Sequence, residues 1–292
     1  MFNKMHYNQE ISMTTENLGI LHPGEMGITI ALAAQNTGHN VFGASQGRSP
    51  ETRHRAQKLG LQDTNSLAKL CEYCSIIICV CPPSAAEDIA AQVINQGYQG
   101  IYIDANAISP QGVTRIAEAM GEAGISFVDG GIIGGPAWKP DTTRLYLSGK
   151  GSERAATYFS AGPLGVSVLG ESIGQASALK MCYAAYTKGT TALLCAILAT
   201  AQAHNVREYL SEEWAQSIPR LVEDAPRRVK RVTGKAWRFS GEMEEIAATF
   251  SSVGIPGGFH LAAAEIYQRL AGYKGAETPE LEQVLTSLLK PG

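Results

Sequence analysis

Short apolar runs alternate with amphipathic helical stretches from residue 18 to about residue 168. Several of the runs are continuously hydrophobic, which is typical of parallel strands that are buried on both faces. The regular alternation of such strands with helices predicts a parallel sheet wound by helices. The expected strands are Leu18–Leu21, Asn40–Ala44, Ser75–Val80, Ile101–Asp104, Ser126–Asp129, Leu145–Ser148 and Ser167–Leu169.

The alternation stops at about Ser172, and helical patterns rich in Ala, Leu and Glu follow. The first of these helices runs to about His204 and is apolar on nearly every face, so its own domain or a second subunit has to bury it. The pattern predicts an α/β domain over residues 18–170 and an all-helical domain over residues 171–292. Residues 1–17 are polar, and we expect a flexible N-terminal extension rather than a secretory signal.

The formal net charge is -3 over 292 residues, and the Lys and Arg residues are scattered along the chain. Such a chain has no polybasic face, so nucleic acid and anionic membranes are not expected partners. The most apolar helical stretch, Thr190–Ala203, is shorter than the roughly 20 residues that span a bilayer. We therefore expect no membrane anchor and a cytoplasmic location.

The six cysteines do not indicate a metal site. Cys71 and Cys74 form a C-x-x-C pair, but a zinc site needs a second pair or histidines at ligand spacing. The other four lie among apolar neighbours, where a thiol behaves as a small hydrophobic group. Their usage is typical of a reducing compartment.

A turn of dinucleotide-binding type follows the first expected strand. Gly24 and Gly27 match the last two glycines of G-x-G-x-x-G, and His22 stands at the position of the first. In this motif the pyrophosphate lies at the helix N-terminus. The expected cofactor contacts are His22, Pro23, Gly24, Glu25 and Met26; the alternative is an ordinary turn.

The loop after the second strand indicates which dinucleotide is bound. It lacks the acidic residue that would bind the 2′-hydroxyl of NAD, and it carries Ser45, Arg48 and Ser49 instead. A guanidinium and two hydroxyls suit a 2′-phosphate, so NADP(H) is favoured and NAD(H) is the second choice. The alternative is a solvated loop arginine.

Further strand ends point to the same edge of the sheet, where ligands of doubly wound folds bind. The expected additional cofactor contacts are Cys81, Pro82, Pro83 and Asn106. A glycine-rich segment after the fifth strand would expose backbone N–H groups to a substrate, although a plain flexible loop is also consistent with it. The substrate contacts expected there are Gly131, Ile132, Ile133 and Gly134.

With these motifs, the sequence resembles the β-hydroxyacid dehydrogenase superfamily, which includes 3-hydroxyisobutyrate and 6-phosphogluconate dehydrogenases. The resemblance covers residues 18–204, and over the whole chain it is closest to a phosphogluconate dehydrogenase-like branch. It is carried by His22–Gly27, Asp104–Pro110, Lys235–Arg238 and Gly241–Ile246. It implies an NADP-binding Rossmann domain, a long interdomain helix, and an all-α C-terminal domain for substrate binding and dimerisation. A homodimer with a small-molecule substrate in the interdomain cleft is then expected.

The resemblance also implies a catalytic residue. The family's catalytic lysine lies early on the interdomain helix, and Gly174–Lys180 matches that segment with Lys180 in its place. The family's substrate-binding serine aligns with Ile133, and its asparagine aligns with Ala184. Because both groups would orient a hydroxyacid, a ketone, an imine or an unsaturated substrate becomes more plausible.

Physical reasoning supports Lys180 independently, because an ammonium on an apolar helix has to find a partner, face a cleft or lose its proton. A lysine that snorkels to the surface is the alternative. Tyr183 and Thr187 follow on nearly the same helix face, and Tyr183 is a second candidate for catalysis. His260 is a further candidate for substrate binding.

In the second domain, Glu242 and Glu245 lie three residues apart on one helical face. We expect these two carboxylates to be solvated, and a plain helix-start position is the alternative for His260.

The function predicted from these residues is hydride transfer between NADPH and a small carbonyl, imine-like or hydroxyacid substrate, with Lys180 as general acid and base. One alternative is an oxidative hydroxyacid dehydrogenase that also decarboxylates, as in the phosphogluconate relatives. Another is an NADP(H)-binding sensor without turnover. Lys180 favours the enzyme, whereas Ile133 and Ala184 favour the sensor.

Overall fold

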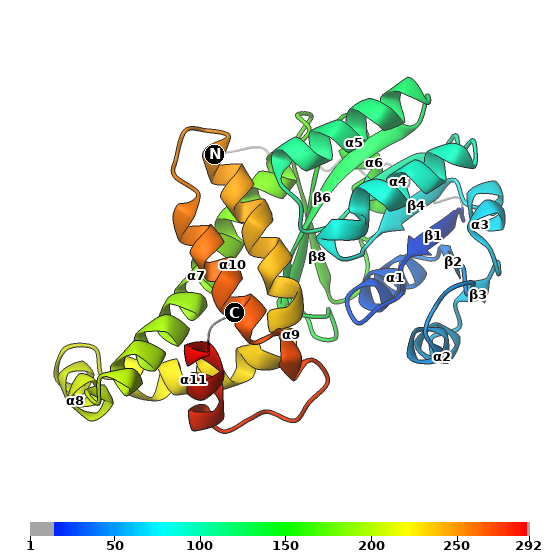
Figure 1. The fold of residues 1–292 in the computed structure, drawn as a ribbon. Helices are drawn as coiled ribbons and strands as arrows, with labels where there is room; N and C mark the ends of the chain where they lie inside the picture. Colours follow the sequence, from blue (N-terminus) through cyan, green and yellow to red (C-terminus); the bar gives the residue numbers. More distant parts are fainter. Residues whose placement is uncertain (1–14, 291–292) are drawn as a thin grey trace, which may run out of the picture.

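The computed structural model describes residues 15–290. An α/β domain with one mixed sheet is followed by a group of long helices (Figure 1). Most of the predicted N-terminal extension lies outside the described residues. Asn17, its last residue, is the first residue of the first strand.

The sheet confirms the predicted fold class. Its strands are β1 (Asn17–Leu21), β2 (Asn40–Gly43), β3 (Gln62–Asp63), β4 (Ile76–Cys79), β5 (Ile101–Asp104), β6 (Ser126–Gly134), β7 (Thr143–Ser148) and β8 (Leu164–Gly170). Their spatial order is β3-β2-β1-β4-β5-β6-β7-β8, and the β6–β7 pair is antiparallel whereas the others are parallel. The strand order reverses between β1 and β4, so their carboxyl ends form the switch point where such sheets bind ligands.

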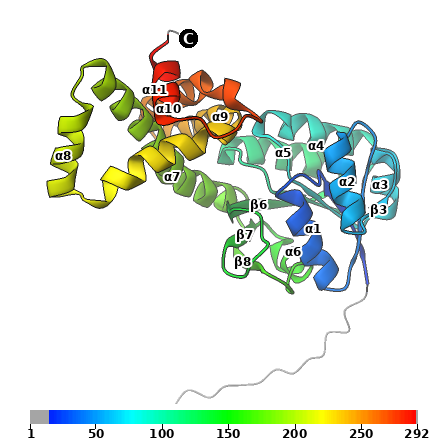
Figure 2. The ribbon, with the colours of Figure 1, turned by 90° about the horizontal axis from the view of Figure 1, so that it is seen from below.

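Helices cover both faces of the sheet. They are α1 (Gly27–Asn36), α2 (Pro50–Lys58), α3 (Leu67–Tyr73), η1 (Pro83–Ala85), α4 (Ala86–Asn95), α5 (Pro110–Glu122) and α6 (Ser152–Thr157). One apolar core packs α1 and α6 against the sheet, and a second core packs α3, α4 and α5 against its other face (Figure 2). Gly38, Gly60 and Gly97 follow helix ends with positive φ, a conformation that favours glycine.

The second half of the chain is helical. It consists of α7 (Gln175–Ala203), α8 (Arg207–Ser217), α9 (Arg220–Ser251), α10 (Gly258–Arg269), η2 (Ala271–Tyr273) and α11 (Leu281–Leu289). The helices α7, α9, α10 and α11 share one buried core. In contrast, α8 has no buried residue and projects from the molecule in Figure 2. Within residues 15–290, no helix is long and apolar enough to cross a membrane.

The prediction that the glycine-rich segment forms a loop is wrong. Strand β6 continues through these glycines to Gly134 and pairs with β7. The glycines serve close packing: a Cβ on Gly131 would lie 2.5 Å from the carbonyl oxygen of Ala176, where α7 crosses the strand. The sequence also gave no sign of β3, since its two residues are both exposed and carry no apolar run.

Candidate functional site

The turn between β1 and α1 has the shape that a dinucleotide requires. A Cβ on Gly27 would lie 2.1 Å from the carbonyl oxygen of His22, so only glycine allows the helix to start this close to the strand. A Cβ on Gly24 would meet nothing within 4 Å, which leaves its outer side open to a ligand. The His22 side chain is half-buried, and burial together with the charge of Arg48 lowers its pKa to about 4. It is therefore neutral at pH 7.

These residues fit a pyrophosphate. The backbone N–H groups of Glu25 and Met26, just before the first turn of α1, have no hydrogen-bond partner among residues 15–290. The first turn itself contains no acidic residue. Free amides and the positive end of the helix dipole favour an anion at this position.

The loop after β2 carries the cation Arg48 and lies next to an anion, Asp63 of β3. The Arg48 Nε donates to the Gln46 carbonyl at 3.4 Å. Ser49 is the N-cap of α2, so part of its hydrogen-bonding capacity is used within the protein. The Asp63 carboxylate accepts the Ser45 N–H at 3.1 Å. Sequence reasoning missed Asp63 because it looked for an acid only after β2, whereas this one ends the neighbouring strand β3.

Asn106 binds within the protein and positions the ends of β4 and β5. Its Oδ1 accepts the Cys81 N–H at 2.6 Å, and its Nδ2 donates to the Asp104 carboxylate at 2.8 Å. Burial raises the pKa of Asp104 to about 7, the Asn106 hydrogen bonds oppose that rise, and the Asp129 charge adds to it. Asn106 thus holds Cys81 and the following prolines at the switch point, and its predicted contact with the cofactor stays a prediction.

Lys180 lies where α7 crosses β6. Its ammonium donates to the Ile132 carbonyl oxygen at 2.5 Å. Burial lowers the pKa of this lysine to about 8, with a further lowering by Lys188 and Arg238 that Glu242 opposes. A group with this pKa both donates and accepts protons near neutral pH.

Asp129 fixes the start of α7 and was not predicted as a site residue. Its fully buried carboxylate accepts from the hydroxyls of Ser148 (2.9 Å) and Ser177 (2.6 Å) and from the backbone N–H groups of Gly174 (3.0 Å), Ala176 (3.0 Å) and Ser177 (3.1 Å). Asp129 lies on β6, three residues before Ile132. It therefore anchors the helix of Lys180 to the strand that holds the lysine's acceptor.

A second ionic pair lies beyond Lys180 between α7 and α9. Lys188 donates to Glu242, both side chains are nearly buried, and the Lys188 ammonium lies 4.6 Å from the centroid of the Phe239 ring. Glu245 accepts the backbone N–H of Ser109 at 2.7 Å, which links α9 to the start of α5. The expectation that Glu242 and Glu245 are solvated is therefore wrong, because both belong to the packing of the helical domain against its neighbours.

The remaining predicted residues are not brought into hydrogen-bond contact with Lys180 in the described part of the chain. Tyr183 is 50% exposed. The Thr187 hydroxyl donates to the Tyr183 carbonyl within the helix. His260 is buried between Phe250 and Phe259, and it packs near Gly189, more than two turns along α7 from Lys180. Their roles at a substrate remain predictions.

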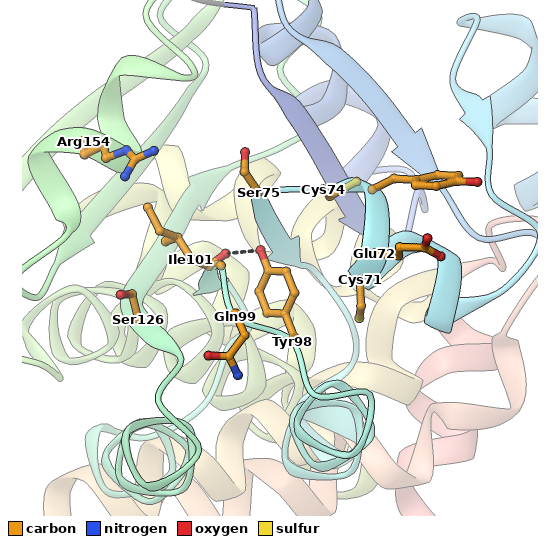
Figure 3. Close-up of a pocket in the computed structure, with 11 residues that line it drawn as sticks. Cys71, Glu72, Cys74, Ser75, Tyr98, Gln99, Ile101, Ser126 and Arg154 are labelled. Atoms are coloured by element: carbon orange, nitrogen blue, oxygen red, sulfur yellow. Dashed lines mark hydrogen bonds between the residues drawn. The ribbon is translucent and has the colours of Figure 1, made fainter.

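A shallow hollow of about 510 Å³ lies at the opposite, amino edge of the sheet (Figure 3). It is lined by residues at the starts of β4, β5 and β6, among them Ser75, Ile101 and Ser126, and by Arg154. In Figure 3 the Tyr98 hydroxyl donates to the Ile101 carbonyl at 3.1 Å. Doubly wound sheets bind ligands at the carboxyl edge. The candidate site is therefore the edge with the β1–α1 turn and not this hollow. No group of three metal-ligating side chains occurs in residues 15–290.

Two family models match the chain. Residues 17–158 match the NAD binding domain of 6-phosphogluconate dehydrogenase, and residues 201–270 match a domain of unknown function, DUF1932. An uncharacterized 28.5 kDa protein of Methanothermus fervidus is 31% identical over 156 residues, which are 53% of this chain and 59% of that protein. The match thus spans about three fifths of that relative.

Solved structures share the fold. The 3-hydroxyisobutyrate dehydrogenase of Mycobacterium tuberculosis, solved with L-serine, has a TM-score of 0.69 and 16% identity, with 95% of this chain and 100% of that chain covered. A variant imine reductase of Myxococcus stipitatus, solved with NAD+, has a TM-score of 0.55 and 17% identity over 95% of this chain and 100% of that chain. The resemblance to the β-hydroxyacid dehydrogenases is confirmed, with a fold that imine reductases share.

Proposed function

We propose that this chain is an NADP(H)-dependent oxidoreductase, because residues 17–158 match the NAD binding domain of 6-phosphogluconate dehydrogenase and residues 201–270 match DUF1932. Its reaction would be hydride transfer between NADPH and a small carbonyl, imine-like or hydroxyacid substrate. The observation that carries this proposal is Lys180, which is held on the Ile132 carbonyl at the carboxyl side of the sheet and has a pKa of about 8.

The chemistry divides between the cofactor and the chain. A bound nicotinamide dinucleotide supplies or accepts the hydride. The ammonium of Lys180 gives a proton to the substrate oxygen or nitrogen during reduction, and the neutral amine takes it back during oxidation. The Ile132 carbonyl orients the ammonium, and Asp129 keeps α7 in register with β6. A pKa of about 8 leaves both protonation states accessible near neutral pH, so the site can work in either direction.

We propose NADP(H) as the preferred cofactor. Arg48 lies in the loop that would meet the adenosine ribose, and it forms no ion pair within residues 15–290. The N-terminus of α2, capped by Ser49, follows directly and favours a phosphate. Asp63 opposes this preference, but its carboxylate already accepts two backbone N–H groups, from Ser45 and Asn65. Those hydrogen bonds satisfy part of its charge.

We propose a homodimer in which α7 is covered by a second copy. Leu179, Tyr183, Tyr186 and Leu193 lie along α7 and are between 37% and 74% exposed, which is unusual for a helix this apolar. Isologous pairing of two such faces would bury them. The projecting helix α8 has no buried residue and is available to the same interface.

The decisive experiment compares wild type with Lys180→Met in NADPH oxidation against panels of ketones, imines and oxo acids, and in NADP+ reduction with hydroxyacids. Methionine keeps the apolar stem and removes the proton, so turnover should fall about 10²- to 10⁴-fold. NADPH affinity, measured by calorimetry, should stay unchanged. The matched control is Lys235→Met, an exposed lysine on α9.

The outcomes separate the alternatives. Near-normal turnover by Lys180→Met would refute its role as general acid and base. Tight NADPH binding without turnover on any panel would favour the sensor.

A further inference from the structure

We infer that Arg238 binds an anionic group of the substrate, so that the substrates are carboxylate-bearing carbonyl or imine compounds. This inference rests on the proposed function, since it names the substrate class of the same site. It is carried by the placement of charges on the facing sides of α7 and α9.

One face of α9 is directed at the active-site side of the molecule. Arg238, Glu242 and Glu245 are spaced four and three residues apart, so they share that face. Glu242 pairs with Lys188 of α7, and Glu245 accepts the N–H of Ser109 at the start of α5. Arg238, one turn before Glu242, therefore lies on the side of α9 that faces α7 and the α/β domain.

The usual partner of Arg238 is engaged elsewhere. An arginine and a glutamate four residues apart on a helix ordinarily form an ion pair, but Glu242 pairs with Lys188 instead. Arg238 is exposed, and it forms no hydrogen bond or ion pair with any residue from 15 to 290. Its guanidinium carbon lies 5.5 Å from the Phe239 ring centroid, and Lys188 lies over the same ring. The Phe239 ring therefore packs near the Arg238 guanidinium, and the guanidinium N–H groups stay available to a ligand.

The local charges leave an excess of positive charge. Lys180, Lys188 and Arg238 contribute three cations, whereas Glu242 and Glu245 contribute two carboxylates, which are engaged by Lys188 and the Ser109 N–H. Lys188 and Arg238 both lie at the Phe239 ring, so these two cations face a common region, and both lower the pKa of Lys180. A guanidinium binds a carboxylate through two parallel hydrogen bonds, so it matches this anion better than a lysine would.

This placement also explains two departures from the family pattern. Ile133 and Ala184 replace the polar groups that would orient a hydroxyacid, and both are buried apolar residues. Neither can contact a carboxylate through a hydrogen bond. Arg238 would supply that recognition from α9, whereas the positions that lost it lie on β6 and α7.

The test measures binding of unreactive carboxylates to the full chain saturated with NADP+. The probes are malonate, succinate and glutarate, with the corresponding diamides as neutral analogues, and dissociation constants come from ligand-observed NMR titrations. Arg238→Gln removes the charge at an exposed position, where the fold tolerates it. The matched control is Arg220→Gln, which removes an exposed arginine from the far end of α9.

At least one dicarboxylate should bind wild type, and Arg238→Gln should weaken that binding about 10- to 100-fold. Arg220→Gln should bind within about twofold of wild type, since its charge lies far from the site. The inference is overturned if no dicarboxylate binds, if Arg238→Gln binds as tightly as wild type, or if the diamides bind equally well.

A failure of the proposed function is distinguishable from a failure of this inference. If NADP+ does not bind, the proposed function fails, and the same titration of the protein alone still decides the role of Arg238. If NADP+ binds and the carboxylates do not, only the substrate class is wrong.

Discussion

Removing the Lys180 ammonium should stabilise the protein at neutral pH even though it abolishes the proposed chemistry. Burial makes the charged form costly, which is why the pKa of this lysine lies near 8 rather than at its ordinary value of 10.5. Lys180→Met keeps a side chain of similar length that packs against the same apolar neighbours. The variant therefore removes the penalty and keeps the packing.

The size of the effect follows from linkage. Lowering the pKa of Lys180 from 10.5 to about 8 corresponds to roughly 3 kcal/mol of folding free energy, at about 1.4 kcal/mol per pKa unit. This is an upper limit, because the side chain keeps partial contact with water and methionine loses the hydrogen bond to Ile132. Between pH 8 and 10.5 the unfolded chain binds more protons at this lysine than the folded chain does. Wild-type stability should therefore rise with pH in that window relative to Lys180→Met.

The assay is urea unfolding of both proteins at pH 7, 8, 9 and 10, and it needs no substrate. Lys180→Met should be more stable at pH 7 by about 1–3 kcal/mol, and the difference should shrink toward zero as the pH approaches 10. A matched Lys235→Met variant should show no such dependence, because that side chain is exposed. A constant or widening gap between Lys180→Met and wild type would show that Lys180 is not held in a desolvating site.

Four other predictions follow from named contacts. Arg48→Ala should weaken NADPH binding about 10- to 100-fold in calorimetry and leave NADH binding unchanged. An equal loss of affinity for both cofactors would exclude a contact between Arg48 and the 2′-phosphate. Asp63→Asn should strengthen NADPH binding. In the reductive direction, kcat should fall as the pH rises through about 8, because the ammonium form of Lys180 is the proton donor; a flat profile would contradict this. Asp129→Asn should lower the free energy of unfolding by about 2–4 kcal/mol and reduce turnover, since up to four donors lose their carboxylate oxygen; a loss below about 0.5 kcal/mol in urea unfolding would argue against the anchor. Light scattering should find a dimer that Leu193→Glu dissociates, and a stable wild-type monomer would refute the covered α7 face.

The sheet and the long helix were predictable because their signals are local. Buried parallel strands are continuous apolar runs, as in Ile76–Cys79, and the change to helical periodicity after residue 170 needs no long-range information. The glycine-rich segment was misread because glycine signals a loop by composition. In the fold, glycine is required at Gly131 because α7, which begins more than 40 residues later, packs against the strand there. No local pattern contains that crossing.

The site residues show the same difference between local signals and long-range contacts. Gly24, Gly27 and Lys180 were identifiable because a short motif fixes their chemistry, and Asp63, Asp129 and Glu242 were not, because each acquires its role from a partner on another element. Glu242 illustrates the reason: from sequence, Arg238 four residues earlier is its natural partner, and both charges then cancel on a solvated helix.

The fold brings Lys188 of α7 to Glu242, so Glu242 pairs with Lys188 and not with Arg238. The pairing buries one carboxylate and leaves Arg238 near Lys180 without a counter-ion among residues 15–290. The positive charge available for a substrate is therefore a property of how two helices pack, and a substitution at Lys188 that frees Glu242 for Arg238 should weaken carboxylate binding without touching either the cofactor turn or Lys180.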